Sequence, residues 1–264
     1  MKAYDFEYGG ESLSSYGYMI CQIGSKGVET LSGGAEITFN TLAVHGGTKH
    51  EVVSIQYNDC LETTIQICKN PCGNENMEIS VDEFRLLQRW LNRKGFYKFK
   101  ILGDEYFGFY FEAKFNVKRI EFEGKVIALE LDVKTNRPFA LEETTRIIFE
   151  NKVAGEEHLL IERSDVEGHI YPKTRIVVLQ DGDLDIYNQI EDRHTVITGC
   201  KNGDVIDMDY PLIFTSRNEH AIQNCFNWNF FRVANSYQNN LNRITMSLQC
   251  KMEIEYAPQI SVGL

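Results

Sequence analysis

ISVDEFRLLQRWLNRKG, residues 79–95, is the stretch on which the fold of this chain depends, because it specifies one helix from start to end. Ser80 and Glu83 have the spacing of a capping box, in which each side chain accepts a hydrogen bond from a free backbone N–H of the first turn. Arg-Lys-Gly at residues 93–95 is typical of a helix C-terminus. The sequence therefore predicts a helix over residues 81–94.

Apolar side chains cover an arc of roughly 220° around this helix, whereas a one-sided surface helix needs about 100°. These side chains are Val81, Phe84, Leu86, Leu87, Trp90 and Leu91. We expect a helix of this kind to have partners on two sides. One partner is the sheet formed by the strands that follow, and the other is either a second sheet of the same domain or a neighbouring subunit.

The residues after the helix alternate as strands do. Residues 96–102 and 106–117 flank Gly103-Asp104-Glu105, which predicts a hairpin, and residues 126–133 alternate between apolar and mostly charged side chains after a turn at Gly124-Lys125. Before the helix, the pattern predicts strands over 18–23, 37–44, 51–57 and 63–68, with loops over 25–34 and 69–75.

The second half of the chain reads as short strands and turns. Two turn dipeptides, Asp181-Gly182 and Asn202-Gly203, each stand between strand patterns and predict hairpins. Pro138 and the polar residues 141–145 mark a boundary, so we expect an N-terminal β domain over 1–140 and a C-terminal β-sandwich over 146–264. The predicted fold class is mainly β with one α-helix, the first domain being a sandwich or barrel-like sheet with a β-hairpin.

Composition restricts the classes of function. The 264 residues are 43% hydrophobic and 25% charged, typical of a soluble protein with a full core, and the formal net charge of −11 argues against specific binding of nucleic acid. The N-terminal residues lack the apolar core of a signal peptide, and the sequence contains no apolar run of membrane-spanning length. We therefore expect a protein made in the cytoplasm, without a membrane partner and with its seven cysteines reduced.

Two clusters resemble metal sites without matching one. Cys60, Cys68 and Cys72 follow His45 and His50, but the second close pair of a structural zinc site is missing, so ordinary reduced thiols are the preferred interpretation. Asp181, Asp183 and Asp185 alternate like the start of a calcium loop, yet the required Gly and Glu positions hold Ile186 and Asp192. We interpret these carboxylates, and likewise Asp204, Asp207 and Asp209, as groups on the solvent face of strands.

No catalytic, cofactor-binding or metal-binding residue follows from the sequence, and we expect no cofactor. The nucleophile elbow Gly-x-Ser-x-Gly and the phosphate loop Gly-x-x-x-x-Gly-Lys are both missing from the chain. Two alternatives stay open. One is a glycoside hydrolase with a spatial pair of carboxyl groups; the other is a carbohydrate-binding, lectin-like module with Phe226, Trp228 and Tyr237 as its aromatic platform or as core residues.

Motifs in both halves resemble the distal tail protein (Dit) family of long-tailed, siphovirus-type phages and prophages. In the first half they are Phe6–Leu13, Tyr16–Ile20, the helix ending in Trp90-Leu91, the aromatic strand Tyr106–Phe115, and Val126–Val133 followed by Pro138. In the second half they are Asp181–Asn188, Gly203–Asp207, Asn229–Phe231 and Asn242–Thr245. The family often has a glycine shortly before the Asn242 position, where this chain has Gln238-Asn-Asn-Leu241, and residues 25–76 have no clear counterpart.

The resemblance implies a structural hub of the phage baseplate and not an enzyme. Members of the family form a homo-hexameric ring at the tail tip, join the tail tube protein to the tail-tip (tail-associated) protein, and leave a channel through which DNA passes. Their C-terminal domain is a galectin-like β-sandwich that often carries receptor-binding proteins. The resemblance thus implies a virion protein of the tail tip, made and assembled in the cytoplasm of a bacterial host.

Overall fold

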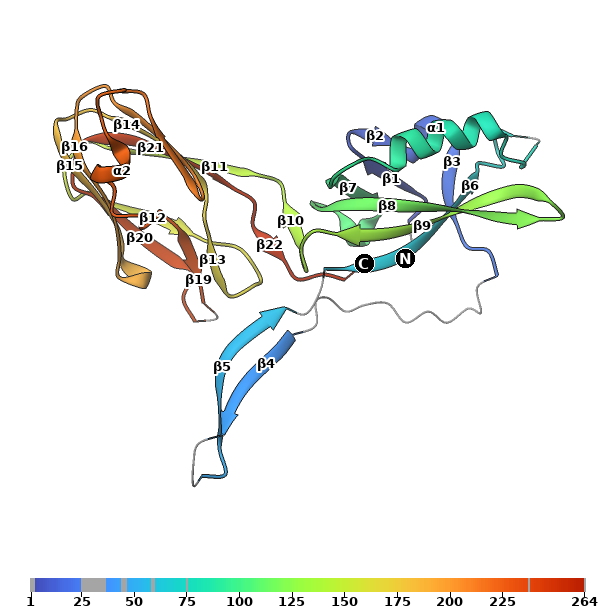
Figure 1. Cartoon of the computed structure of the whole chain (residues 1–264), viewed down its shortest axis with the longest axis horizontal. Coiled ribbons are helices and arrows are strands. Elements are labelled where there is room, and N and C mark those ends of the chain that lie inside the picture. Colours follow the sequence, from blue (N-terminus) through green and yellow to red (C-terminus); the bar gives the residue numbers. More distant parts are fainter. Residues whose placement is uncertain are drawn as a thin grey trace. The chain divides into compact units, whose positions relative to one another are not determined.

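The computed structural model of the chain describes residues 3–24, 37–43, 47–57, 60–74, 76–236 and 238–263 (Figure 1). The chain divides into two compact units, Met1–Glu142 with Ile260–Leu264, and Glu143–Gln259. The predicted second domain, 146–264, includes residues 260–264, whereas Ile260 and Val262 pack against the core of the first unit. The predicted loop over 25–34 lies outside the described residues.

The first unit is built on one nine-stranded sheet. Seven of its strands follow the order β2-β1-β7-β8-β9-β6-β3, while β10 pairs with β8 and β22 pairs with β10. The backbone N–H of Ile20 in β3 donates to the carbonyl of Tyr4 at 2.9 Å, so the β3 edge meets the segment before β1 and the sheet curls toward a barrel. The strands are β1 Asp5–Tyr8, β2 Glu11–Ser12, β3 Tyr18–Cys21, β6 Glu62–Lys69, β7 Tyr97–Leu102, β8 Phe109–Phe122, β9 Lys125–Thr135, β10 Ala140–Glu142 and β22 Gln259–Ile260.

The predicted hairpin after the helix is confirmed, with a longer connection than the sequence suggested. Strands β7 and β8 pair antiparallel, with Phe99 opposite Phe111. Residues 106–108 do not belong to the second strand as predicted, because Asp104–Tyr106 form a turn of 3-10 helix and β8 starts at Phe109.

Helix α1 spans Val81–Leu91 and begins with the predicted capping box. The Ser80 hydroxyl accepts the N–H of Glu83 at 3.3 Å, and the Glu83 carboxylate accepts the N–H of Ser80 at 2.7 Å. These two hydrogen bonds give acceptors to backbone N–H groups that have no partner within the first turn of a helix.

The predicted end of the helix at residue 94 is wrong, because α1 ends three residues earlier. Asn92, with ψ of 63°, leaves the helical conformation. The Arg93 side chain, already outside the helix, then donates from Nε to the carbonyl of Trp90 at 2.8 Å. Arg93 therefore caps the last turn from outside, which its position in the sequence alone could not distinguish from one more helical residue.

A cluster of aromatic side chains lies in the core of the first unit. The Trp90 ring lies between two rings, 5.9 Å from Phe6 and 4.4 Å from Tyr16, both nearly parallel to it. Its indole N–H donates to the carbonyl of Tyr8 at 3.1 Å. Trp90 thereby attaches α1 to β1 through packing and a directed hydrogen bond.

The 3-10 helix η1, Leu13–Tyr16, ends at Gly17, whose φ of 80° turns the chain into β3. Two further strands of the first unit, β4 Ile37–Ala43 and β5 His50–Tyr57, pair only with each other as a separate hairpin (Figure 1). All of their residues are exposed.

The second unit is a β-sandwich, as predicted. One sheet has the order β11-β21-β14-β17-β18, the other β12-β20-β15-β16, and β13 pairs with β19. The core between them contains mainly aliphatic and aromatic side chains. The elements are β11 Thr145–Asn151, β12 Glu157–Ile161, β13 Gly168–Ile170, β14 Lys173–Val178, β15 Gly182–Asn188, η3 Gln189–Glu191, β16 Arg193–Cys200, β17 Val205–Asp209, β18 Leu212–Thr215, α2 Ile222–Cys225, β19 Val233–Asn235, β20 Leu241–Met246 and β21 Cys250–Tyr256.

Both hairpins predicted at Asp181-Gly182 and Asn202-Gly203 are wrong. Strand β14 pairs with β17 and β21, while β15 pairs with β16 and β20, so each of these turns carries the chain from one sheet to the other. The Asp181 carboxylate accepts the N–H of Asn202 at 2.8 Å, which braces the two turns against each other. A turn dipeptide specifies a reversal of the chain, but not which strand the chain joins next.

Candidate functional site

The cysteines of the suspected metal cluster do not form a metal site in the described part of the chain. Among those residues, no group of three or more His, Cys, Asp or Glu side chains is arranged to hold a metal ion. Cys60, Cys68 and Cys72 are free thiols, and His45 lies outside the described residues. Burial and a hydrogen bond with Cys68 raise the pKa of Cys21 to about 12, so this thiol stays protonated at neutral pH.

The first aspartate series serves the sandwich itself. Asp183 accepts the N–H of Gly199 at 2.8 Å, and Asp185 lies 2.8 Å from His194 Nδ1. The backbone N–H of Asn202 and the Lys201 ammonium lower the pKa of Asp181. Asp183 and Asp185 therefore contact β16 and Asp181 contacts the turn that follows it, and the three carboxylates do not converge on one cation.

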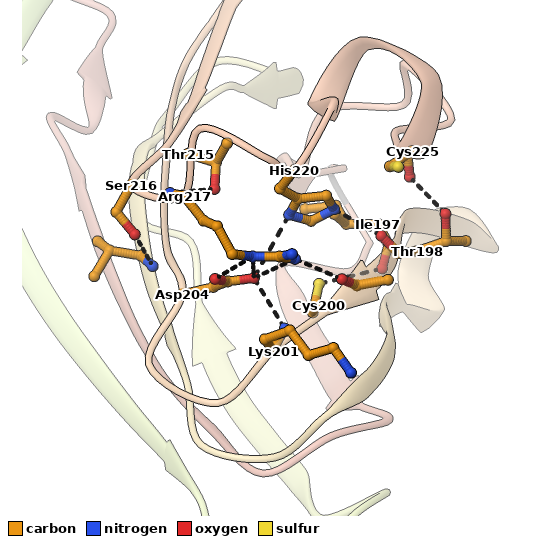
Figure 2. A network of polar contacts seen from close by, with 12 residues as sticks. Ile197, Thr198, Cys200, Lys201, Asp204, Thr215, Ser216, Arg217, His220 and Cys225 are labelled. Carbon is orange, nitrogen blue, oxygen red and sulfur yellow. Dashed lines mark hydrogen bonds and ion pairs between the residues drawn. The ribbon is translucent and has the colours of Figure 1, made fainter.

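The prediction of a solvent-facing carboxylate is wrong for Asp204, which is only 3% exposed. Figure 2 shows the Arg217 guanidinium lying against it, with Nε 2.9 Å from Oδ1 and Nη2 3.1 Å from Oδ2. The N–H of Lys201 donates to Asp204 at 2.9 Å, and Nη2 of Arg217 also donates to the carbonyl of Gly199 at 2.8 Å. Burial favours the neutral acid, but the bonds from Arg217 and Lys201 outweigh it and lower the pKa of Asp204.

His220 completes this network from the segment before α2. Its Nε2 lies 2.8 Å from the carbonyl of Thr198, an acceptor only, so Nε2 carries the proton, and Nδ1 lies 3.6 Å from Asp204 (Figure 2). The network thus fastens the turn between β16 and β17 to the residues that follow β18. Arg217 and His220 are not predictable from a local motif, since their partners Asp204 and Thr198 are distant along the chain.

Two residues of the suspected aromatic platform, Phe226 and Trp228, differ strongly in exposure. Phe226 is a core residue at 5% exposure, Trp228 is 55% exposed, and Tyr237 lies outside the described residues. Trp228 has φ of 60°, a left-handed conformation that is unusual for a bulky residue. Asn227 holds this conformation by donating to the carbonyl of His194 at 2.9 Å and accepting the N–H of Asn229 at 3.1 Å.

Helix α1 has one buried and one open side. Leu87, Trp90 and Leu91 are buried, whereas Val81 is 75% and Leu86 54% exposed. The expectation of a second sheet of the same domain over the helix is therefore wrong within the described residues. A hollow of about 530 Å³ runs along this open side, lined by Asp82, Arg85, Leu86, Gln88, Arg89 and Asn92.

A buried lysine joins this helix to the sheet. Lys69, at the end of β6 and 7% exposed, places Nζ 2.8 Å from Glu83 and 2.7 Å from the carbonyl of Glu78. Burial alone would raise the pKa of Glu83, but its bonds with Lys69 and Ser80 lower it. Glu83 thus caps the helix and binds the sheet at once, and the capping pattern gave no sign of the second role.

The carboxyl groups with shifted pKa values do not suit acid catalysis. A glycosidase acid needs a raised pKa, whereas Glu83, Asp181, Asp204 and Glu253 all have lowered ones. For Glu253 the cause is the Arg146 guanidinium, 2.6 Å away. These four groups therefore act as ion-pair partners or acceptors of backbone hydrogen bonds.

The two units define a two-domain, mainly β protein whose first unit leaves apolar surfaces uncovered. The chain belongs to a family of phage tail proteins: the family profile of a phage tail protein N-terminal domain matches residues 1–137, and that of a phage tail C-terminal domain matches residues 139–256. No curated protein sequence shows significant similarity to the chain. The described residues contain no helix long and apolar enough to cross a membrane.

Solved structures that match the chain include the crystal structure of the Dit (gp 19.1) protein of phage SPP1, whose title calls it a paradigm of the hub adsorption apparatus in phages that infect Gram-positive bacteria. The match has a TM-score of 0.66 at 9% sequence identity, and it covers 97% of this chain and 99% of that one. The chain therefore has the Dit fold, which confirms the resemblance seen in the sequence motifs.

Proposed function

We propose that this phage tail protein is the hub of a tail tip, where six copies form a ring around a channel for DNA. The observation that carries the proposal is the match to the SPP1 Dit structure along nearly the whole length of both chains. The ring would join the tail tube protein to the tail-tip protein, and its second unit would carry receptor-binding proteins. Assembly would take place in the host cytoplasm, and the role would require no catalysis.

Two properties of the chain support this proposal. A net charge of −11 would repel DNA, so a channel lined by such chains would let the polymer pass without holding it. The open side of α1, with Val81 and Leu86 exposed, offers the kind of apolar surface that an oligomer interface covers.

The test is sedimentation velocity combined with negative-stain electron microscopy on the full chain, alone and co-expressed with its tube or tail-tip partner. We expect a hexamer that appears as a ring in at least one of these conditions. A strict monomer in all of them would refute the hub. Antibody labelling of virions should place the protein at the tail tip, and labelling along the tail tube instead would refute the position.

A second candidate is a carbohydrate-binding module, and the exposed Trp228 favours it. An indole that is 55% exposed beside the polar residues Asn227 and Asn229 suits stacking against a sugar ring. The test is a glycan array with the full chain and its Trp228→Ala variant. Binding that the variant loses would support the module at Trp228, equal binding would exclude Trp228 as its platform, and no binding by the full chain would remove the module.

A further inference from the structure

The hairpin of β4 and β5 has two chemically different faces. Because alternate residues of a strand point to opposite sides, Ile37 and Phe39 share a face with their cross-strand partners Tyr57 and Ile55. We call these four side chains the apolar strip. Their exposures are 44%, 57%, 40% and 57% in that order, so most of the strip is open to water.

The opposite face is polar next to the strip, and Leu42, 66% exposed, follows Asn40 on it. It carries Thr38 opposite Gln56 and Asn40 opposite Ser54, and the Asn40 amide donates to the Ser54 hydroxyl at 3.0 Å. Beyond this pair the register shifts by one residue, so that Thr41 faces Val52. Over these two residue pairs the hairpin is thus amphipathic, and it offers a polar control position next to each apolar one.

Such a hairpin needs a cover. Two strands without a third strand or a helix packed on them are marginally stable in water. The Tyr57 ring contacts Phe139 with their centroids 5.7 Å apart, which anchors the hairpin at the end away from its turn. The remainder of the strip stays exposed in the single chain.

The same unit offers a surface that complements the strip. The open side of α1 presents Leu86, 54% exposed, at the hollow of about 530 Å³ between Arg85 and Arg89. Arginine side chains pack well against aromatic faces, and the strip supplies Phe39. Both surfaces are exposed in the single chain, so neither covers the other within one copy.

Charge is compatible with a contact between two copies at these two surfaces. Each copy carries a net charge of −11, so two copies repel unless the contact is neutral or pairs opposite charges. The apolar strip has no charged side chain, and the hollow along α1 contains two arginines and one aspartate. The strip and the hollow can therefore meet without adding like charges.

We infer that the apolar strip of one copy docks on the open side of α1 in a second copy, and that this contact joins neighbours in the ring. The inference rests on the proposed hub function and names the surfaces that hold the ring together.

A photo-crosslinking amino acid tests the contact directly. Phe39→p-benzoylphenylalanine places the probe on the strip, and Asn40→p-benzoylphenylalanine places it on the polar face as a matched control. After irradiation of the assembled protein, we expect covalent dimers from the first variant only, with the adduct mapped to residues 81–92 of the other copy. Adducts within one chain, adducts to other regions, or equal yields from both variants would overturn the inference.

Charge substitutions give the second test. Phe39→Lys and Leu86→Asp alter opposite sides of the contact at exposed positions, so the fold should survive, as circular dichroism can verify. Phe39→Lys sets a positive charge against Arg85 and Arg89, and Leu86→Asp removes the apolar group of the hollow. We expect each to weaken self-association at least tenfold in sedimentation, while Asn40→Lys leaves it unchanged. If the wild type forms rings and Phe39→Lys forms them equally well, the docking inference fails and the hub stands. If the wild type stays monomeric with every partner, the hub itself fails.

Discussion

Replacing Trp90 with alanine tests how α1 is attached to the sheet. The indole is 3% exposed, lies between the rings of Phe6 and Tyr16, and donates to the carbonyl of Tyr8. Truncating a buried tryptophan typically costs about 3–5 kcal/mol, and the carbonyl of Tyr8 would also lose its donor in a buried site. We therefore expect a loss of about 4 kcal/mol, which for a unit of this size lowers its melting temperature by roughly 10 °C.

Differential scanning calorimetry is the suitable assay, since it can separate the transitions of the two units. Trp90→Phe should lie between the wild type and Trp90→Ala, because it keeps an aromatic ring but removes the indole donor. Trp228→Phe is the matched control: its side chain is 55% exposed, and the change should stay within about 0.5 kcal/mol. A loss below about 1 kcal/mol in Trp90→Ala would show that Trp90 does not hold the helix, and the description of this core would be wrong.

The remaining predictions concern the polar contacts. Ser80→Ala should destabilise the first unit by about 1 kcal/mol through the lost cap, and an unchanged thermal transition would refute the capping box. The pKa of Glu83 is lowered on folding, so the carboxylate stabilises the folded state fully above the ordinary carboxyl pKa, and this stabilisation is lost as the pH falls through the folded-state pKa. Glu83→Gln should therefore flatten the acid limb of a curve of stability against pH, and an identical limb would argue against this role. Lys69→Met removes the charge that lowers this pKa, so the acid limb should move toward higher pH, and a limb that stays in place would show that Lys69 does not stabilise the Glu83 carboxylate. Asp204→Asn should cost the second unit about 2 kcal/mol by weakening charged hydrogen bonds with Arg217, measurable by urea unfolding, and a midpoint equal to that of the wild type would contradict the network.

Local patterns in the sequence predicted local structure well. The capping box at Ser80 and Glu83 and the strand over 126–133 follow from interactions between residues a few positions apart, and both are confirmed. The mainly β class with one long helix followed from the same patterns. The end of α1 was missed by three residues because Arg93 caps the helix equally well from outside it.

The candidate sites depended on contacts that no local pattern contains. Lys69 reaches Glu83 from the end of β6, and Arg217 reaches Asp204 across 13 positions of the chain. A sequence shows that such residues are charged, but not that they are buried together. Trp228 likewise could be read as core or surface until the conformation of its loop was known.

By itself, the sequence determined which segments become strands or helix and where the chain turns, because capping, alternation and turn chemistry act over a few residues. Only the tertiary structure decided that Asp181-Gly182 and Asn202-Gly203 carry the chain between sheets and that one side of α1 stays open. Strand partners and burial depend on the competition of all strands and faces for one core, and that competition is settled only when distant segments meet.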